Sequence, residues 1–213
     1  MKTDELVKML AAGAGAVEQN VAQRRFATAL GWGACGAMLI MAIKLGVRPD
    51  FYVAMHSPMF WMKFAFPLAG ATAAIHMAIR LGQPGMHIGN APTVVTALLL
   101  TVWLSGATVL LQAPIERRDY LIYGISWDVC PSNIALISIP VFIAAMWAMK
   151  GLAPTRPVTT GAATGLVAGT IAIVVYALHC PEMEAPFLAI WYVLGMLIPV
   201  VAGALIGPIV LRW

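Results

Sequence analysis

Two cysteine-proline steps carry the most distinctive chemistry in this chain. Cys130-Pro131 and Cys180-Pro181 each lie at the border of a long apolar run. Two thiols can form a disulfide in an oxidising compartment, stay reduced and open to thiol exchange, or bind a soft metal ion. The residues alone leave these three states open. A disulfide that only staples two helix pairs together, and two thiols that never touch, are open as well.

Histidine and carboxylate side chains on the same side of the predicted bundle could complete a soft-metal site with the thiols. A metal of this kind would act as a signal, and no resident cofactor is expected. The candidate auxiliary ligands are His56, Asp128, His179, Glu182 and Glu184.

The composition of the chain predicts an all-α integral membrane protein. Of its 213 residues, 61% are hydrophobic and 10% are charged, and the mean hydropathy is +0.86. A soluble domain has about 25% charged residues, whereas helices of about 20 apolar residues cross a bilayer. Six such spans, arranged as three helical hairpins, form a predicted transmembrane domain over residues 26–213, after an N-terminal segment over residues 1–25. The predicted spans are 26–45, 59–79, 93–111, 134–149, 159–178 and 185–211.

The distribution of lysine and arginine predicts which way the bundle faces. With six spans, both termini and the second and fourth loops share one side, which holds eight of these residues against five on the other side. Arg24 and Arg25 directly precede the first span and reinforce the bias. Both termini are therefore expected in the cytoplasm, and Cys130 and Cys180 are expected on the outer face.

Small and polar residues within the spans are expected to have structural roles. Glycines recur every four residues over 161–169 in the fifth span and over 203–207 in the sixth, which favours close helix packing. Lys63 lies one turn inside the second span, where its ammonium can snorkel to the outer interface. Cys35 lies in an apolar run without polar neighbours and is expected to be a buried packing residue.

Signatures of enzymes and ion-coupled carriers are missing from the sequence. It has no His-Glu-x-x-His zinc motif, no Walker loop, no Gly-x-Ser-x-Gly elbow and no haem attachment pair, and no carboxylate lies deep in a predicted span. We therefore expect that the protein is not an enzyme. The alternative that remains is a small transporter for a thiophilic metal, with the two cysteines as an outer loading site, although the spans offer few ligands along a path.

The segment before the first span predicts a short amphipathic helix over residues 3–10. Thr3 can cap it, and acidic residues follow in the first turn. Leu6 and Leu10 share one face with Met9 beside them, and nothing obvious in the chain covers that face. Such a helix lies on a lipid surface or enters a groove on a partner protein, and both remain open. The segment lacks the features of a cleavable signal peptide, so we expect it in the mature protein.

Six segments spread along the whole chain match the pattern of one family. They are Met1-Lys2-Thr3-Asp4-Glu5-Leu6, Arg48-Pro49-Asp50, Cys130, Leu152-Ala153-Pro154-Thr155-Arg156-Pro157, Leu178-His179-Cys180-Pro181-Glu182 and Trp191-Tyr192. In these segments the chain resembles the NrsF-type membrane proteins, negative regulators of extracytoplasmic-function sigma factors in proteobacteria. The resemblance implies a six-span anti-sigma factor of the bacterial inner membrane. Such a protein holds its sigma factor at the cytoplasmic face until an envelope stress releases it.

The resemblance also implies that Cys130 and Cys180 detect the signal. We therefore expect that oxidation, or the binding of a heavy metal, at this pair changes the spacing of the fourth and fifth spans. The change can reach the cytoplasmic face, where Leu6, Met9 and Leu10 are expected to hold the sigma factor, only if the bundle has two states. The expected partners are that sigma factor and the lipid bilayer, with no direct binding to nucleic acid.

Overall fold

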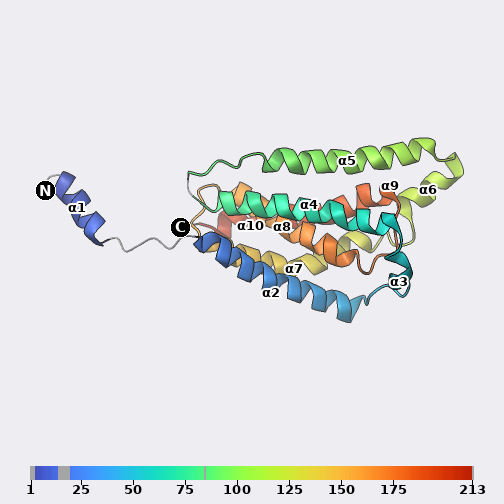
Figure 1. Cartoon of the computed structure of the whole chain (residues 1–213), viewed down its shortest axis with the longest axis horizontal. Coiled ribbons are helices and arrows are strands. Elements are labelled where there is room, and N and C mark those ends of the chain that lie inside the picture. Colours follow the sequence, from blue (N-terminus) through green and yellow to red (C-terminus); the bar gives the residue numbers. More distant parts are fainter. Residues whose placement is uncertain (1–2, 14–19, 84, 213) are drawn as a thin grey trace.

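The computed structural model describes residues 3–13, 20–83 and 85–212, and every regular element in these ranges is a helix. Six of the helices are long, and the others are short pieces at their ends or before them (Figure 1). In chain order the elements are α1 (Thr3–Gly13), α2 (Val21–Lys44), α3 (Phe51–Ala54), α4 (Pro58–Leu81), α5 (Ala91–Gln112), α6 (Ile115–Tyr123), α7 (Cys130–Lys150), α8 (Pro157–Tyr176), α9 (Ala185–Phe187), the π-helical η1 (Leu188–Tyr192) and α10 (Val193–Val210).

The six predicted spans are confirmed. They correspond to α2, α4, α5, α7, α8 and the continuous run from α9 to α10, each long and apolar enough to cross a membrane. The long helices lie lengthwise beside one another, with the start of α2 and the end of α10 at the same end of the bundle (Figure 1). We call this the termini end, and the opposite end, where α7 begins and α8 finishes, the cysteine end. The chain is a multi-pass, all-α membrane protein.

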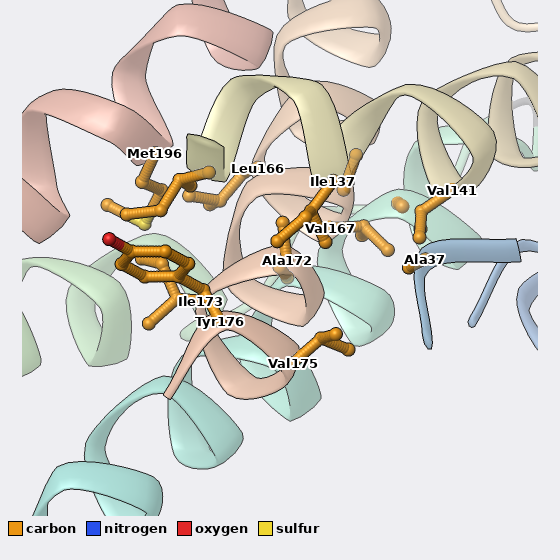
Figure 2. Close-up of a cluster of buried hydrophobic side chains, with 14 of the residues drawn as sticks. Ala37, Ile137, Val141, Leu166, Val167, Ala172, Ile173, Val175, Tyr176 and Met196 are labelled. Carbon is orange, nitrogen blue, oxygen red and sulfur yellow. The ribbon is translucent and has the colours of Figure 1, made fainter. Parts of the chain in front are cut away.

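Helix α8 forms the centre of the bundle. Over an apolar stretch of 18 residues in α8, 67% of the residues are buried inside the protein. The corresponding fraction for α5, at the edge of the bundle, is 6%. The helix packs against α10, α7 and α4. Figure 2 shows this core, in which Ile137 and Val141 of α7 lie near Val167 of α8, with Met196 of α10 near Ile173 on another side. The central helix is therefore surrounded by protein, whereas α5 has most of its surface available to lipid.

The predicted glycine packing is confirmed where α8 crosses α10. A Cβ atom added to Gly161 would collide with the carbonyl oxygen of Gly203, and one added to Gly165 would collide with that of Pro199. The same holds in the reverse direction for Gly203 against Gly161. The two backbones therefore touch, which small residues alone permit.

The expectation that Cys35 is a buried packing residue is wrong, because its side chain is exposed. Helix α2 turns only one stripe of residues toward α7, and Cys35 lies off that stripe. An apolar sequence gives no sign of which side faces lipid, because lipid and protein interior are equally apolar. The buried stripe consists of Ala22, Phe26, Ala29, Gly33, Ala37 and Met41.

The predicted N-terminal helix is confirmed as α1, which extends to Gly13. Its apolar residues Leu6, Met9 and Leu10 are all exposed, and Figure 1 shows α1 apart from the bundle. A second short helix, α6, was not predicted, because the stretch between the third and fourth spans lacks apolar length. It lies with α3 at the cysteine end (Figure 1).

Candidate functional site

Cys130 and Cys180 lie in the same buried cluster at the cysteine end. Both are free thiols with an exposed fraction of 0%. Cys130 is the first residue of α7, and Cys180 follows α8, where its backbone N–H donates to the carbonyl oxygen of Tyr176 at 3.0 Å. Tyr176 and Tyr192 are buried in the same cluster. The fold thus brings two thiols from separate hairpins to the same end of the bundle, and neither is exposed to solvent.

Lys63 ties the loop after α8 to helix α4. Its ammonium donates hydrogen bonds to the carbonyl oxygens of Cys180 and Glu182, both at 2.7 Å. The side chain is only 3% exposed, and its Nζ lies 5.4 Å from the ring centroid of Tyr192. The expected snorkelling toward the interface is therefore wrong: this face of α4 is covered by protein, and the ammonium is satisfied by buried carbonyls instead.

Arg48 adds a second cation to the same loop. Its Nη1 donates to the carbonyl oxygen of Cys180 at 3.5 Å, and its backbone N–H donates to that of Leu178 at 3.2 Å. Its Nε and Nη2 form a bidentate pair with the Asp50 carboxylate at 2.7 and 2.6 Å. The hydrogen bond from Arg48 lowers the pKa of Asp50 and raises the pKa of Arg48 itself. The pair fixes the guanidinium beside Cys180.

Glu182 joins the loop after α8 to the loop between α6 and α7. Its buried carboxylate accepts a hydrogen bond from the backbone N–H of Ile125 at 2.7 Å. The carboxylate packs directly on Gly124, where an added Cβ would lie 2.7 Å from the carboxyl carbon. Gly124 has φ +53°, so both the space and the backbone favour glycine there. Glu182 therefore anchors two loops to each other.

The other predicted auxiliary ligands lie in separate settings. The Nδ1 atom of His179 is 2.9 Å from the carbonyl oxygen of Gly46, and that of His56 is 2.9 Å from the carbonyl oxygen of Tyr52 in its own helical turn. Asp128 is exposed. Within residues 3–13, 20–83 and 85–212, no group of three or more His, Cys, Asp and Glu side chains is arranged to hold a metal ion. A metal-binding role for these residues stays a prediction.

Sequence reasoning did not assign Lys63, Arg48 or Tyr192 to this site. One signal was available, since a lysine one turn inside an apolar span is costly unless it has a partner. Tyr192 lies in the Trp191-Tyr192 segment that matches the family pattern, but its residue type gives no physical signal of this kind. It is buried by the π-helical turn η1, a distortion that is frequent at functional sites and that the sequence does not mark.

The arrangement makes the thiols responsive to movement of the elements around them. Because neither thiol is exposed, a reagent reaches them only when the loop after α8 shifts. That loop is held by α4 through Lys63 and by the segment before α7 through Glu182. The segment that contains Cys180 is therefore connected to α4 by direct hydrogen bonds.

Comparison with known proteins gives the family. A family model described as "NrsF: Negative regulator of sigma F" matches residues 10–213, which include the whole six-helix bundle. The chain belongs to the NrsF family. It is 47% identical over 213 residues to the "Probable anti-sigma-F factor NrsF" of Azospira oryzae, with all of both chains covered.

A second NrsF relative is more distant. The "Anti-sigma-F factor NrsF" of Caulobacter vibrioides is 34% identical over 215 residues, again with all of both chains covered. No solved structure matches the chain. The NrsF resemblance that the sequence motifs predicted is confirmed over the full length.

Proposed function

We propose that this chain is an anti-sigma factor of the bacterial inner membrane that binds an extracytoplasmic-function sigma factor and releases it when its thiols react. The observation that carries the proposal is the full-length similarity to two proteins named as anti-sigma-F factors. An enzymatic role is not part of the proposal, because those relatives are named as regulators.

The proposed orientation has both termini in the cytoplasm. The side of the chain that contains the termini carries eight of the thirteen Lys and Arg residues, including Arg24 and Arg25 before the first span. Positive charge near span ends is retained on the cytoplasmic side. In this orientation the cysteine end faces the periplasm, where oxidants and external metals arrive first.

The proposed output is α1. Leu6, Met9 and Leu10 are exposed apolar side chains on a helix whose described residues are all exposed. A helix of this kind binds in an apolar groove of a soluble partner. The sigma factor then covers the surface that the bundle leaves open.

The proposed input is Cys130 with Cys180. Oxidation joins the two sulfurs, removes both thiol protons and passes two electrons to an external oxidant. A thiophilic metal instead displaces the two protons and binds both sulfurs. Either product changes the distance between the start of α7 and the loop after α8.

The connection between input and output is α4. Lys63, in the second turn of this helix, holds the Cys180 loop, and Arg80 lies in its last turn at the termini end. A helix of 24 residues spans about 36 Å, enough to carry a rigid displacement across the bundle. Coupling requires two packing states of this helix, biased by both sites.

Co-purification tests the partner. The full chain, expressed with the sigma factor encoded beside its gene, should retain that sigma factor on an affinity column. Leu6→Asp with Leu10→Asp should abolish retention because charge replaces the apolar face, whereas Lys8→Gln on the opposite face of α1 should not. Retention that survives the double Asp variant would contradict the role of α1.

Release of the bound sigma factor tests the proposed role of the two cysteines as a sensor. Treatment of the complex with hypochlorite or a cadmium salt should free the sigma factor from the wild type and not from Cys130→Ser or Cys180→Ser. Cys35→Ser is the matched control, since its thiol is exposed and lies off the buried stripe of α2. Equal release from all variants would overturn the sensor and leave the anti-sigma role intact.

A further inference from the structure

In the described residues of the bundle, acidic side chains occur at only one of its two ends, whereas basic side chains occur at both. Within residues 20–83 and 85–212, every Asp and Glu lies at the cysteine end, in the loops after α2 and α8 or in and just after α6. Over the same residues, the charged side chains of the termini end are all basic. They are Arg24, Arg25, Arg80, Lys150, Arg156 and Arg212.

Membrane orientation explains the basic residues at the termini end but not the lack of acidic residues there. The positive-inside rule favours Lys and Arg on one side but makes almost no demand on Asp and Glu. Acidic residues would also pair with the arginines and stabilise the loops. Their absence from this end of the bundle over residues 20–83 and 85–212 therefore needs a separate cause, and a partner that supplies the negative charge is one.

A pocket lies between two loops on this basic face. It has a volume of about 190 Å³ and is lined by Arg80, Gln83 and His87 from the end of α4 and the following loop, with Thr155 and Arg156 from the residues before α8. The volume is well above the space that one water molecule requires. Every one of these five side chains can donate a hydrogen bond.

The two arginines of the pocket are free to bind an anion. The one ion pair formed within the described residues joins Arg48 to Asp50 at the opposite end. Arg80 uses one N–H for the carbonyl oxygen of His87 at 3.2 Å. Its guanidinium lies against Gly89, where φ is +68° and an added Cβ would be 2.6 Å from Nη1. Gly89 therefore leaves the space in which the guanidinium sits.

The position of the pocket favours a protein side chain over a lipid headgroup. Arg156 directly precedes α8, the helix surrounded by α10, α7 and α4. The pocket therefore lies at the end face of the bundle, beside the start of its central helix. A phosphate in the surrounding bilayer meets the outer helices first.

We propose that the pocket formed by Arg80, His87 and Arg156 binds an acidic side chain of the soluble protein that α1 holds. This inference rests on the proposed anti-sigma function and adds a second contact with the sigma factor. The contact at the pocket is charged, whereas the contact at α1 is apolar. Two contacts made by one chain raise the effective affinity of both. The pocket also lies at the end of α4, so a displacement of that helix would disturb it directly.

Binding measurements in nanodiscs of phosphatidylcholine test the pocket with the full chain and the purified sigma factor. Arg80→Gln and Arg156→Gln should each weaken binding about fivefold or more, because each removes a charge pair at an interface. Lys150→Gln removes the same charge from the same face outside the pocket and should change the dissociation constant less than about twofold. Gly89→Ala should also weaken binding, since it displaces Arg80 without any change in charge.

Each other outcome contradicts the inference in its own way. Equal losses for Lys150→Gln and the pocket variants would mean diffuse attraction, and unchanged binding for all variants would mean that the pocket is not used. An effect of Arg80→Gln that is seen only when phosphatidylglycerol is added would assign the pocket to a lipid. No binding by the wild type would contradict the proposed function itself.

Discussion

A lysine buried in a membrane helix is tolerated only where its ammonium is hydrogen-bonded, and Lys63 meets this condition through backbone carbonyls. Cys180 and Glu182 supply those carbonyls at 2.7 Å, and Arg48 reaches the first of them as well. The cations therefore hold the loop that carries the thiol. At the scale of single residues, the position of Cys180 is fixed by neighbours that bind its backbone.

Replacing Lys63 by Met should loosen this loop. The variant removes the Lys63 hydrogen bond from both carbonyls and leaves that of Cys180 with only the longer bond from Arg48, at a cost of about 1–3 kcal/mol in stability. In a chain whose only cysteine is Cys180, maleimide should then react with the thiol faster than in the Lys63 parent. Lys44→Met, at the exposed end of α2, is the control. An unchanged labelling rate for Lys63→Met would contradict the proposed role of Lys63 in holding this loop.

At the scale of elements, the contact of α8 with α10 holds the bundle together. Gly161 and Gly203 place each backbone against a carbonyl group of the other helix. Side-chain packing and close approach drive helix association in lipid, where burial of apolar surface gives no gain. The close contact between the two backbones therefore fixes the position of α8 and resists displacement of the helices packed against it.

Gly161→Ala should separate α8 from α10. The new methyl group collides with the Gly203 backbone, so we expect a loss of about 1–3 kcal/mol, measured as a lower unfolding temperature in detergent. Gly31→Ala makes the same change on α2, where nothing lies within 4 Å of the new atom. That control should be neutral or slightly stabilising because alanine favours a helix. Equal effects at both glycines would rule out close packing as the cause.

At the scale of the whole molecule, the proposed sensor places input and output at opposite ends of one bundle. The thiols lie at the start of α7 and after α8, at the cysteine end. The basic pocket is formed by residues at the end of α4 and before α8, at the termini end, where α2 also starts (Figure 1). A signal must therefore cross the membrane through helices that are already tightly packed. This geometry favours rigid displacement of a helix such as α4 over local rearrangement.

The orientation can be measured directly. A green fluorescent protein fused after the C-terminus should fluoresce, and alkaline phosphatase fused at the same point should be inactive, because the orientation proposed from the positive-inside bias places this end in the cytoplasm. Alkaline phosphatase inserted in the loop after α8 should be active. The opposite pattern would reverse the assignment of input and output.

The sequence by itself determined the six spans, the close packing of their glycines and the family. Span length and apolar content are local properties of the chain, and a membrane helix forms from them without help from distant residues. The motifs around Cys130 and Cys180 are local as well. For this reason the residue pattern alone is enough to single out the two thiols.

Only the tertiary structure decided which side chains meet. Lys63 lies far from Cys180 in sequence and reaches its carbonyl because α4 packs on α8, while Cys35 faces outward because α2 turns another stripe toward α7. The basic pocket likewise joins two loops separated by three helices. In a membrane protein both faces of a helix are apolar, so hydrophobic pattern cannot say which face is covered, and contacts between helices settle it.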